Sequence, residues 1–247
     1  MGSIQVPEGA FSAPAQQVVL DGFLFDMDGT IIDSTRAIEM HWASVGKEIG
    51  VDPELILKTS HGRRSIDTLK IYCPEKATIE YASEMEGRLP KLYSKEAEEI
   101  PGARSLLDSI IAAKATPWAI VTSGTKPLVN GWLEALNLPR PEHMITAESV
   151  ENGKPDPTCY LMGLDGLGLR DRAANVLVLE DSPAGILAGK AAGCKVLGLV
   201  TSHTVEQVVA AGPDWVVKDL ASVRLVSADN GSVTLEIVDA LDSKQLS

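Results

Sequence analysis

Short apolar runs rich in Val, Leu and Ile alternate with helical segments over most of this chain. The runs lie at residues 18–25, 118–121, 144–146, 176–179, 196–200 and 215–217. Runs that are apolar at almost every position predict strands buried on both faces, and such strands form parallel sheets that helices cover on both sides. The alternation therefore predicts a doubly wound, Rossmann-like α/β core.

The segment between the first and second runs has a different pattern. Residues 34–98 contain no convincing strand, and apolar residues recur at helical spacing before a break at His61-Gly62 and again over 77–97, where Pro90 interrupts the pattern. This block predicts an all-helical cap inserted into the core. The core is then expected to consist of residues 18–33 and 99–247.

Both ends of the chain depart from the α/β pattern. Residues 1–17 are rich in Pro, Ala, Gln and Ser and predict a loose leader. Near the other end, two β-type runs at 223–226 and 233–237 flank Asn230-Gly231, a sequence typical of tight hairpin turns. We expect a C-terminal β-hairpin.

Composition excludes several classes of protein. The formal net charge is −12, from 34 acidic and 22 basic residues, so the surface is expected to repel nucleic acid and anionic membranes. No apolar run reaches the ~18 residues of a membrane span, and no secretory signal is evident at the N-terminus. The three cysteines, Cys73, Cys159 and Cys194, are too few and too widely spaced for a disulfide framework. We expect a cytoplasmic protein, and a monomer since no unexplained apolar stripe indicates an interface.

Four polar motifs lie at or beyond the carboxyl ends of predicted strands. They are Asp26-Met27-Asp28-Gly29-Thr30, Thr122-Ser123-Gly124, the loop around Lys154, and Glu180-Asp181. Each motif alone has an ordinary interpretation as a turn, a surface lysine or an acidic helix start. Their joint occurrence is more informative, because ligands of doubly wound sheets bind beyond the carboxyl ends of the strands.

The residue types in these motifs complement one another. The carboxylates of Asp26, Asp28, Glu180 and Asp181 would crowd negative charge into one place, which favours a cation, and oxygen ligands suit Mg²⁺. The Thr122 hydroxyl and the backbone amides of Ser123 and Gly124 could bind phosphate oxygens, and Lys154 would add a positive charge. The sequence therefore predicts a magnesium and phosphate site on an acidic protein.

The four motifs together resemble the haloacid-dehalogenase-like superfamily, in its phosphatase and phosphomutase branch. The strings are D-M-D-G-T, T-S-G, G-K-P-D-P and L-E-D-S-P-A-G-I, and the match spans nearly the whole chain. Residues 59–62, 100–103, 122–125 and 188–195, with the hairpin tail, are similar to fungal glycerol-phosphate phosphatases and 2-deoxyglucose-6-phosphate phosphatases. Those relatives usually have an aromatic residue where this chain has Arg63.

The resemblance implies a role for each core residue. Asp26 would be the nucleophile that forms an aspartyl-phosphate, and Asp28 the acid and base, with Thr122 and Lys154 stabilising the charge on phosphate. Mg²⁺ would bind Asp26, Asp181 and the backbone carbonyl of Asp28, with Glu180 as a direct or water-mediated ligand.

The cap would close over the site and bind the rest of a small phosphorylated metabolite. His61, Arg63 and Arg64 are candidate substrate-binding residues at the helix break, although two adjacent arginines also suit a solvated helix start. Trp42 lies on an apolar helical stripe and is assigned to the core, while Glu86 and Lys47 are weaker candidates for the site.

Three other functions are consistent with parts of this pattern. A sugar phosphomutase would share every core residue named above. A dehalogenase is disfavoured because that branch lacks the second aspartate, which is Asp28 here. A binding module that kept the fold and lost the chemistry is disfavoured by the complete set of motifs. The expected function is Mg²⁺-dependent hydrolysis of a small polyol or sugar phosphate.

Overall fold

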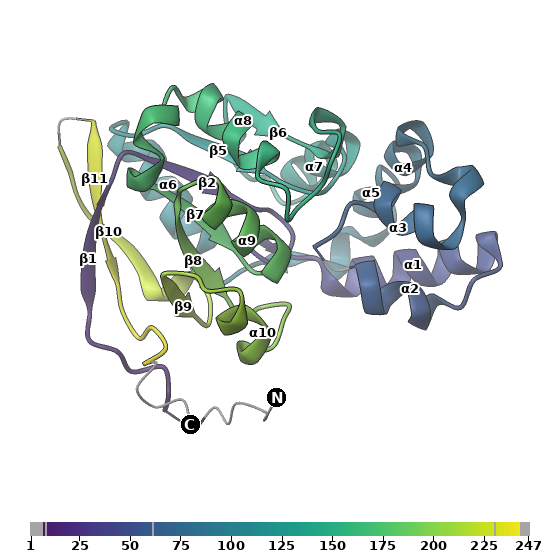
Figure 1. Ribbon diagram of the computed structural model, residues 1–247, viewed down its shortest axis with the longest axis horizontal. Helices are drawn as coiled ribbons and strands as arrows, with labels where there is room; N and C mark the ends of the chain where they lie inside the picture. The colour runs from purple at the N-terminus through teal and green to yellow at the C-terminus, as the bar shows by residue number, and fades with distance from the viewer. Residues whose placement is uncertain (1–6, 8, 61, 230, 243–247) are drawn as a thin grey trace.

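The computed structural model describes residues 7, 9–60, 62–229 and 231–242. A six-stranded sheet, parallel throughout, forms its centre (Figure 1). In spatial order its strands are β6 (His143–Ile145), β5 (Trp118–Val121), β2 (Gly22–Phe25), β7 (Val176–Glu180), β8 (Lys195–Leu199) and β9 (Trp215–Val217). The predicted doubly wound parallel core is therefore confirmed.

Helices cover both faces of this sheet. Alternate residues of β2 show the division, since Phe23 and Phe25 pack in one apolar cluster and Leu24 packs in the other. The first cluster includes α6 (Ala103–Ala113) and α7 (Lys126–Ala135). The second includes α8 (Thr158–Leu167), α9 (Pro183–Ala191) and α10 (Val205–Ala210). The central strands β2 and β7 are buried along their whole length, because helices keep both faces of the sheet from water.

The cap consists of helices that lie to one side of the sheet (Figure 1). They are α1 (Thr35–Ile49), α2 (Pro53–Ser60), α3 (Ser65–Tyr72), α4 (Ile79–Glu86) and α5 (Leu89–Tyr93). The cap has an apolar cluster of its own, which includes Trp42, Ile56 and Met85. A short antiparallel pair, β3 (Ile32–Asp33) and β4 (Glu98–Glu99), forms near the predicted boundaries of this unit.

The predicted helical break at Pro90 is wrong in its position. The chain breaks at Gly87-Arg88, and Pro90 lies in the first turn of α5. Proline is tolerated there because the N–H that it lacks has no partner within the helix.

The apolar run at 18–25 also needs correction, because it forms two strands in two different sheets. β1 (Gln16–Leu20) pairs with β11 (Ser232–Ile237), whereas β2 begins after Asp21 and enters the parallel sheet. The Asp21 carboxylate accepts hydrogen bonds from Asn175 and Ser232, which fixes the chain where it changes sheet. Val19 is 61% exposed, so β1 is buried on one face only.

The C-terminal hairpin is confirmed and gains a third strand. β10 (Val223–Asp229) pairs with β11, and β1 adds to the other edge of β11. Gln16 and Gln17, which the sequence placed in a loose leader, are paired with Ile237 and Glu236. Asn230, in the predicted turn, lies outside the described residues. Within those residues, no helix combines the length and apolar character needed to cross a bilayer.

Buried side chains of β11 belong to the main apolar core, so truncating one of them should lower the stability of the fold. We expect Leu235→Ala to lower the free energy of unfolding by about 2–5 kcal/mol, because Leu235 is fully buried and truncation leaves a cavity. Thr234→Ala, on the opposite face of β11, is the matched control and should cost less than about 1 kcal/mol. Urea unfolding of both variants measures this, and equal losses would contradict the assignment.

Candidate active site

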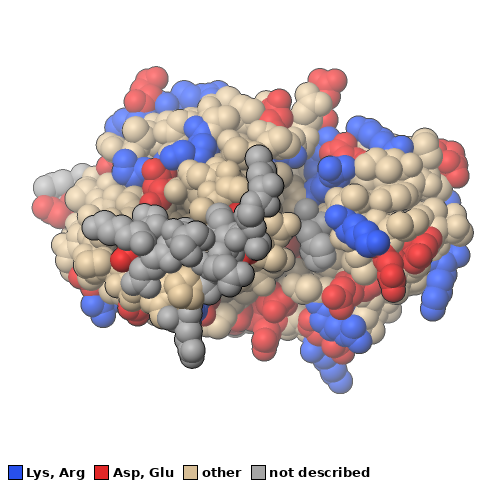
Figure 2. Space-filling view, turned by 60° about the horizontal axis from the view of Figure 1, so that its bottom comes forward, with Lys and Arg blue, Asp and Glu red and all other residues tan. Residues whose placement is uncertain are grey.

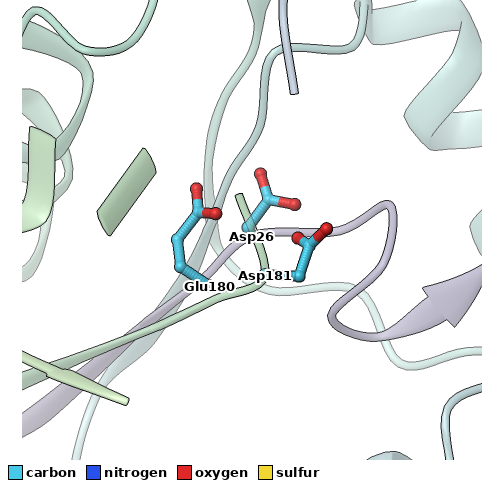
Figure 3. A group of neighbouring side chains, drawn as sticks. All are labelled: Asp26, Glu180 and Asp181. Carbon is cyan, nitrogen blue, oxygen red and sulfur yellow. The ribbon is translucent and has the colours of Figure 1, made fainter. Parts of the chain in front are cut away.

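Three neighbouring parallel strands end at the same edge of the sheet and carry the predicted motifs there. Asp26 follows β2, Thr122 follows β5, and Glu180 and Asp181 lie at the end of β7. Figure 3 shows the side chains of Asp26, Glu180 and Asp181 gathered at this edge. Carboxylate oxygens of these three buried residues lie within 4.8 Å of one another.

The turn after Asp26 is shaped by hydrogen bonds and by a close approach. The backbone N–H groups of Thr30 and Ile31 donate to the carbonyl oxygen of Met27, which closes the turn. Gly29 has φ +85°, and a Cβ atom there would lie 2.2 Å from the Asp181 carboxylate. Only glycine fits, so the D-x-D-G-T string is partly a steric requirement of the acidic cluster.

Lys154 is the cation of the site. Its Nζ lies 2.5 Å from Asp26 Oδ1, 2.5 Å from Glu180 Oε1 and 3.1 Å from the Val121 carbonyl oxygen. Burial opposes the charge, but the Asp26 and Glu180 carboxylates raise the pKa of Lys154 above its ordinary value. Lys154 is therefore a permanently charged ammonium group held against the predicted nucleophile.

One lysine does not offset three buried carboxylates. Burial, with the charges of Glu180 and Asp181, raises the pKa of Asp26 well above its ordinary value, although Lys154 opposes this effect. Burial and the charge of Glu180 raise the pKa of Asp181 to about 7. A divalent cation would relieve this repulsion, so the oxygen-rich cluster fits Mg²⁺.

Glu180 is already surrounded by protein donors. It accepts hydrogen bonds from Lys154, from the Tyr160 hydroxyl at 2.8 Å, and from the backbone N–H and hydroxyl of Ser182, each at 3.0 Å. The side chain is fully buried. This geometry favours Glu180 as the anchor of Lys154 and leaves Asp26 and Asp181 as the better-placed metal ligands. Sequence reasoning missed Tyr160 because its contact comes from α8, outside every motif.

Asp28 lines a cavity between core and cap, together with Asp26 and Asp181. Its carboxylate accepts a hydrogen bond from the Ser34 hydroxyl at 2.5 Å. Burial raises its pKa, while Ser34 and Lys154 lower it. A raised pKa favours the protonated form of the Asp28 carboxyl group, which suits a group that acts as an acid and then as a base.

The predicted phosphate loop lies beside Asp28. Thr122, Ser123 and Gly124 all line the same cavity. The Gly124 N–H, which the sequence predicted to bind a phosphate oxygen, donates instead to the Thr122 hydroxyl at 3.0 Å in this structure. The Ser123 hydroxyl donates to the carbonyl oxygen of Gly62 in the cap at 3.1 Å, which connects the loop with the cap.

The candidate cap residues differ in position. Arg63 lines the cavity, Lys47 is exposed away from it, and His61 lies outside the described residues. Arg64 does not line the cavity, and its contact with substrate stays a prediction. Its guanidinium donates to Asp67 and to the carbonyl oxygens of Ala147, Val150 and Glu151. Arg64 therefore joins the cap to the loop before Lys154.

Several cavity residues were missed or underrated by sequence reasoning. Trp42 belongs to the apolar core of the cap, as predicted, and also lines the cavity. The other cap residues at this surface include His41, Ser60, Ser65 and Glu86. They come from four different helices, so no local spacing could have grouped them.

Comparison with known proteins agrees with this geometry. Residues 23–199 match the family described as haloacid dehalogenase-like hydrolase, and the chain belongs to that family. Glycerol-1-phosphate phosphohydrolase 1 of Saccharomyces cerevisiae is 39% identical over 91% of this chain and 93% of its own length. The 2-deoxyglucose-6-phosphate phosphatase 2 of the same yeast is 35% identical over 91% and 98%, respectively. The resemblance and the phosphatase class predicted from the motifs are thus confirmed.

A solved structure provides a second likeness. It comes from Thermotoga maritima and is provisionally described as a beta-phosphoglucomutase. Its TM-score is 0.62 at 26% identity, over 81% of this chain and 94% of that one. The fold is therefore shared with an enzyme of the predicted alternative class.

The network around Lys154 should stabilise the folded state. We expect Lys154→Met, measured by urea unfolding in the presence of a chelator, to lower the free energy of unfolding by about 3 kcal/mol. The reason is that Asp26 and Glu180 would stay buried without their partner. Lys126→Met, at an exposed position, is the control and should have little effect. Superimposable unfolding curves for wild type and Lys154→Met would contradict this role.

Proposed function

We propose that this protein is a Mg²⁺-dependent phosphatase of small sugar or polyol phosphates and acts through an aspartyl-phosphate on Asp26. The observation that carries the proposal is the position of Asp26. Its buried carboxylate lies 2.5 Å from Lys154, within 4.8 Å of Asp181, and at the wall of the cavity that Asp28 also lines.

In the first step a carboxylate oxygen of Asp26 attacks phosphorus. The new P–O bond to Asp26 forms as the ester P–O bond breaks, and Asp28 donates its proton to the leaving alkoxide. In the second step Asp28 takes a proton from a water molecule that attacks the same phosphorus. Inorganic phosphate leaves and the Asp26 carboxylate is restored.

Charge on the transferred group is stabilised from several sides. Lys154 supplies a fixed positive charge beside Asp26, and Thr122 lines the cavity with its hydroxyl accepting a hydrogen bond from the Gly124 amide. The carboxylates of Asp26 and Asp181 and the backbone carbonyl of Asp28 would hold Mg²⁺. The ion would neutralise phosphate oxygens and orient them for in-line attack.

The names of the relatives support the substrate class. Those relatives are named for glycerol 1-phosphate and 2-deoxyglucose 6-phosphate, which are small monoesters with free hydroxyl groups. The cavity here lies between the catalytic edge and the cap, so cap side chains would meet the alcohol portion of such an ester. Arg63 lines this region, and it is the position at which the chain departs from the usual pattern of the resemblance.

A phosphomutase is the second candidate, favoured by the likeness to the Thermotoga maritima structure. Water and a second sugar phosphate would compete for the same aspartyl-phosphate. Turnover that requires a sugar bisphosphate, with no net release of phosphate, would favour the mutase. Steady release of inorganic phosphate from a single monoester would favour the phosphatase.

The nucleophile assignment gives the most direct test. With Mg²⁺ present, we expect Asp26→Asn to lower kcat for phosphate release from glycerol 1-phosphate and 2-deoxyglucose 6-phosphate by about 10³-fold or more. Asp108→Asn, at an exposed position on α6, is the control and should leave kcat unchanged. Near-normal phosphate release by Asp26→Asn would overturn the mechanism.

Metal dependence separates the roles of Glu180, the last residue of β7, and Asp181, which follows it. Chelation should abolish activity, and Mg²⁺ should restore it. We expect Asp181→Asn to raise the Mg²⁺ concentration for half-maximal activity by about tenfold or more, because a ligand is lost. Glu180→Gln should lower kcat at saturating Mg²⁺ with a smaller change in that concentration, since Glu180 positions Lys154. Equal shifts in Mg²⁺ requirement would instead make both acids ligands.

A further inference from the structure

Polar side chains from four cap helices face the cavity opposite the carboxyl ends of the strands. They are His41 of α1, Ser60 of α2, Ser65 of α3 and Glu86 of α4, and we refer to them as the cap recess. Ile38, Trp42 and Leu89 form apolar wall between and beside them. Polar groups grouped on an apolar wall are typical of a site that binds a small organic molecule.

Two atoms of the cap recess lack partners. Among the described residues, the Nε2 atom of His41 and the Oγ atom of Ser60 are buried and make no hydrogen bond. His41 is 5% exposed and Ser60 6% exposed. A buried polar group without a hydrogen-bond partner destabilises the fold, so two such groups at one cavity wall indicate a ligand that satisfies them.

The groups of the cap recess suit a hydroxyl-bearing ligand better than they suit a phosphate. Burial and the nearby charge of Arg88 lower the pKa of His41 to about 4, so its imidazole is neutral near pH 7 and offers one donor and one acceptor. Burial raises the pKa of the Glu86 carboxyl group to about 7, so near neutral pH this group can accept or donate a hydrogen bond. The phosphate end of a substrate therefore belongs with Lys154 and Thr122, and a neutral, hydroxyl-bearing end suits the cap recess.

Glu86 is held in position by its own contacts. Its carboxylate accepts a hydrogen bond from the Thr125 N–H at 2.7 Å and another from the Ser65 hydroxyl. Thr125 directly follows the phosphate loop at 122–124, so Glu86 links the cap recess to the catalytic edge. A carboxylate fixed in this way can accept a hydrogen bond from a substrate hydroxyl without a large ordering cost.

We propose that His41, Ser60 and Glu86 form the subsite that binds the free hydroxyl groups of the leaving alcohol and thereby selects polyhydroxylated esters. This proposal rests on the phosphatase function proposed above, because it concerns the other end of the same substrate. A site that hydrogen-bonds a substrate hydroxyl rejects analogues that lack it, because the buried polar groups of the site then stay unpaired.

The wild-type enzyme tests the proposal from the side of the ligand. We expect kcat/KM for glycerol 1-phosphate to exceed that for propyl phosphate, which lacks both free hydroxyls, by about tenfold or more. Equal kcat/KM values for the two esters would overturn the subsite. This comparison needs no variant, so it does not depend on whether a cap substitution folds.

Variants then assign the residues. Ser60→Ala and His41→Phe should each lower kcat/KM for glycerol 1-phosphate by about 10–100-fold, and should change it for p-nitrophenyl phosphate less than about threefold. Thr116→Val is the matched control, because it removes an equally buried and unpartnered hydroxyl that lies outside this cavity. It should change neither value.

The two substrates keep the two proposals apart. If wild type hydrolyses p-nitrophenyl phosphate but Ser60→Ala and His41→Phe change kcat/KM for both esters alike, or for neither ester, the subsite is overturned and the phosphatase function stands. If wild type with Mg²⁺ releases phosphate from neither ester, the proposed function is overturned and the subsite with it.

Discussion

The structure depends on one buried interaction, the ammonium group of Lys154 between the carboxylates of Asp26 and Glu180. Buried charges are costly unless they are paired closely, and this pairing requires three chain segments to meet within hydrogen-bond distance. β2 and β7 are adjacent parallel strands, so they bring the two acids together, and the loop after β6 supplies the lysine. The strand order of the sheet is thus a condition for the chemistry.

The same interaction explains how an acidic protein can bind an anionic substrate. The net charge is −12, and on the coloured part of the face in Figure 2 the basic and acidic side chains are interspersed. Attraction for phosphate must therefore be local. In the proposed function it would come from Lys154, from Mg²⁺ held by the acidic cluster and from the phosphate loop, while the cap recess would present imidazole, hydroxyl and carboxyl groups to the rest of the substrate.

The core could be predicted from sequence because the features that define it lie within short segments of the chain. A strand apolar at every position encodes burial on both faces, and a polar motif directly after it encodes a place at the carboxyl edge. The cap was less predictable. Arg63 and Arg64 are adjacent and of the same type. Arg63 lines the cavity, whereas Arg64 binds Asp67 and three carbonyl oxygens of the core. That difference depends on how the cap docks, which no spacing encodes.

By itself the sequence determined the parallel core, the inserted helices, the hairpin and the positions of Asp26, Asp28, Thr122, Lys154 and Asp181, because periodicity and strand ends are properties of short segments. Only the tertiary structure decided that the apolar run 18–25 divides, with residues 18–20 in β1 beside the hairpin and residues 22–25 in β2. It also decided that Glu180 anchors Lys154 and that four cap helices share one recess. These features arise from contacts between segments far apart in the chain, where burial and hydrogen-bond partners are set by packing.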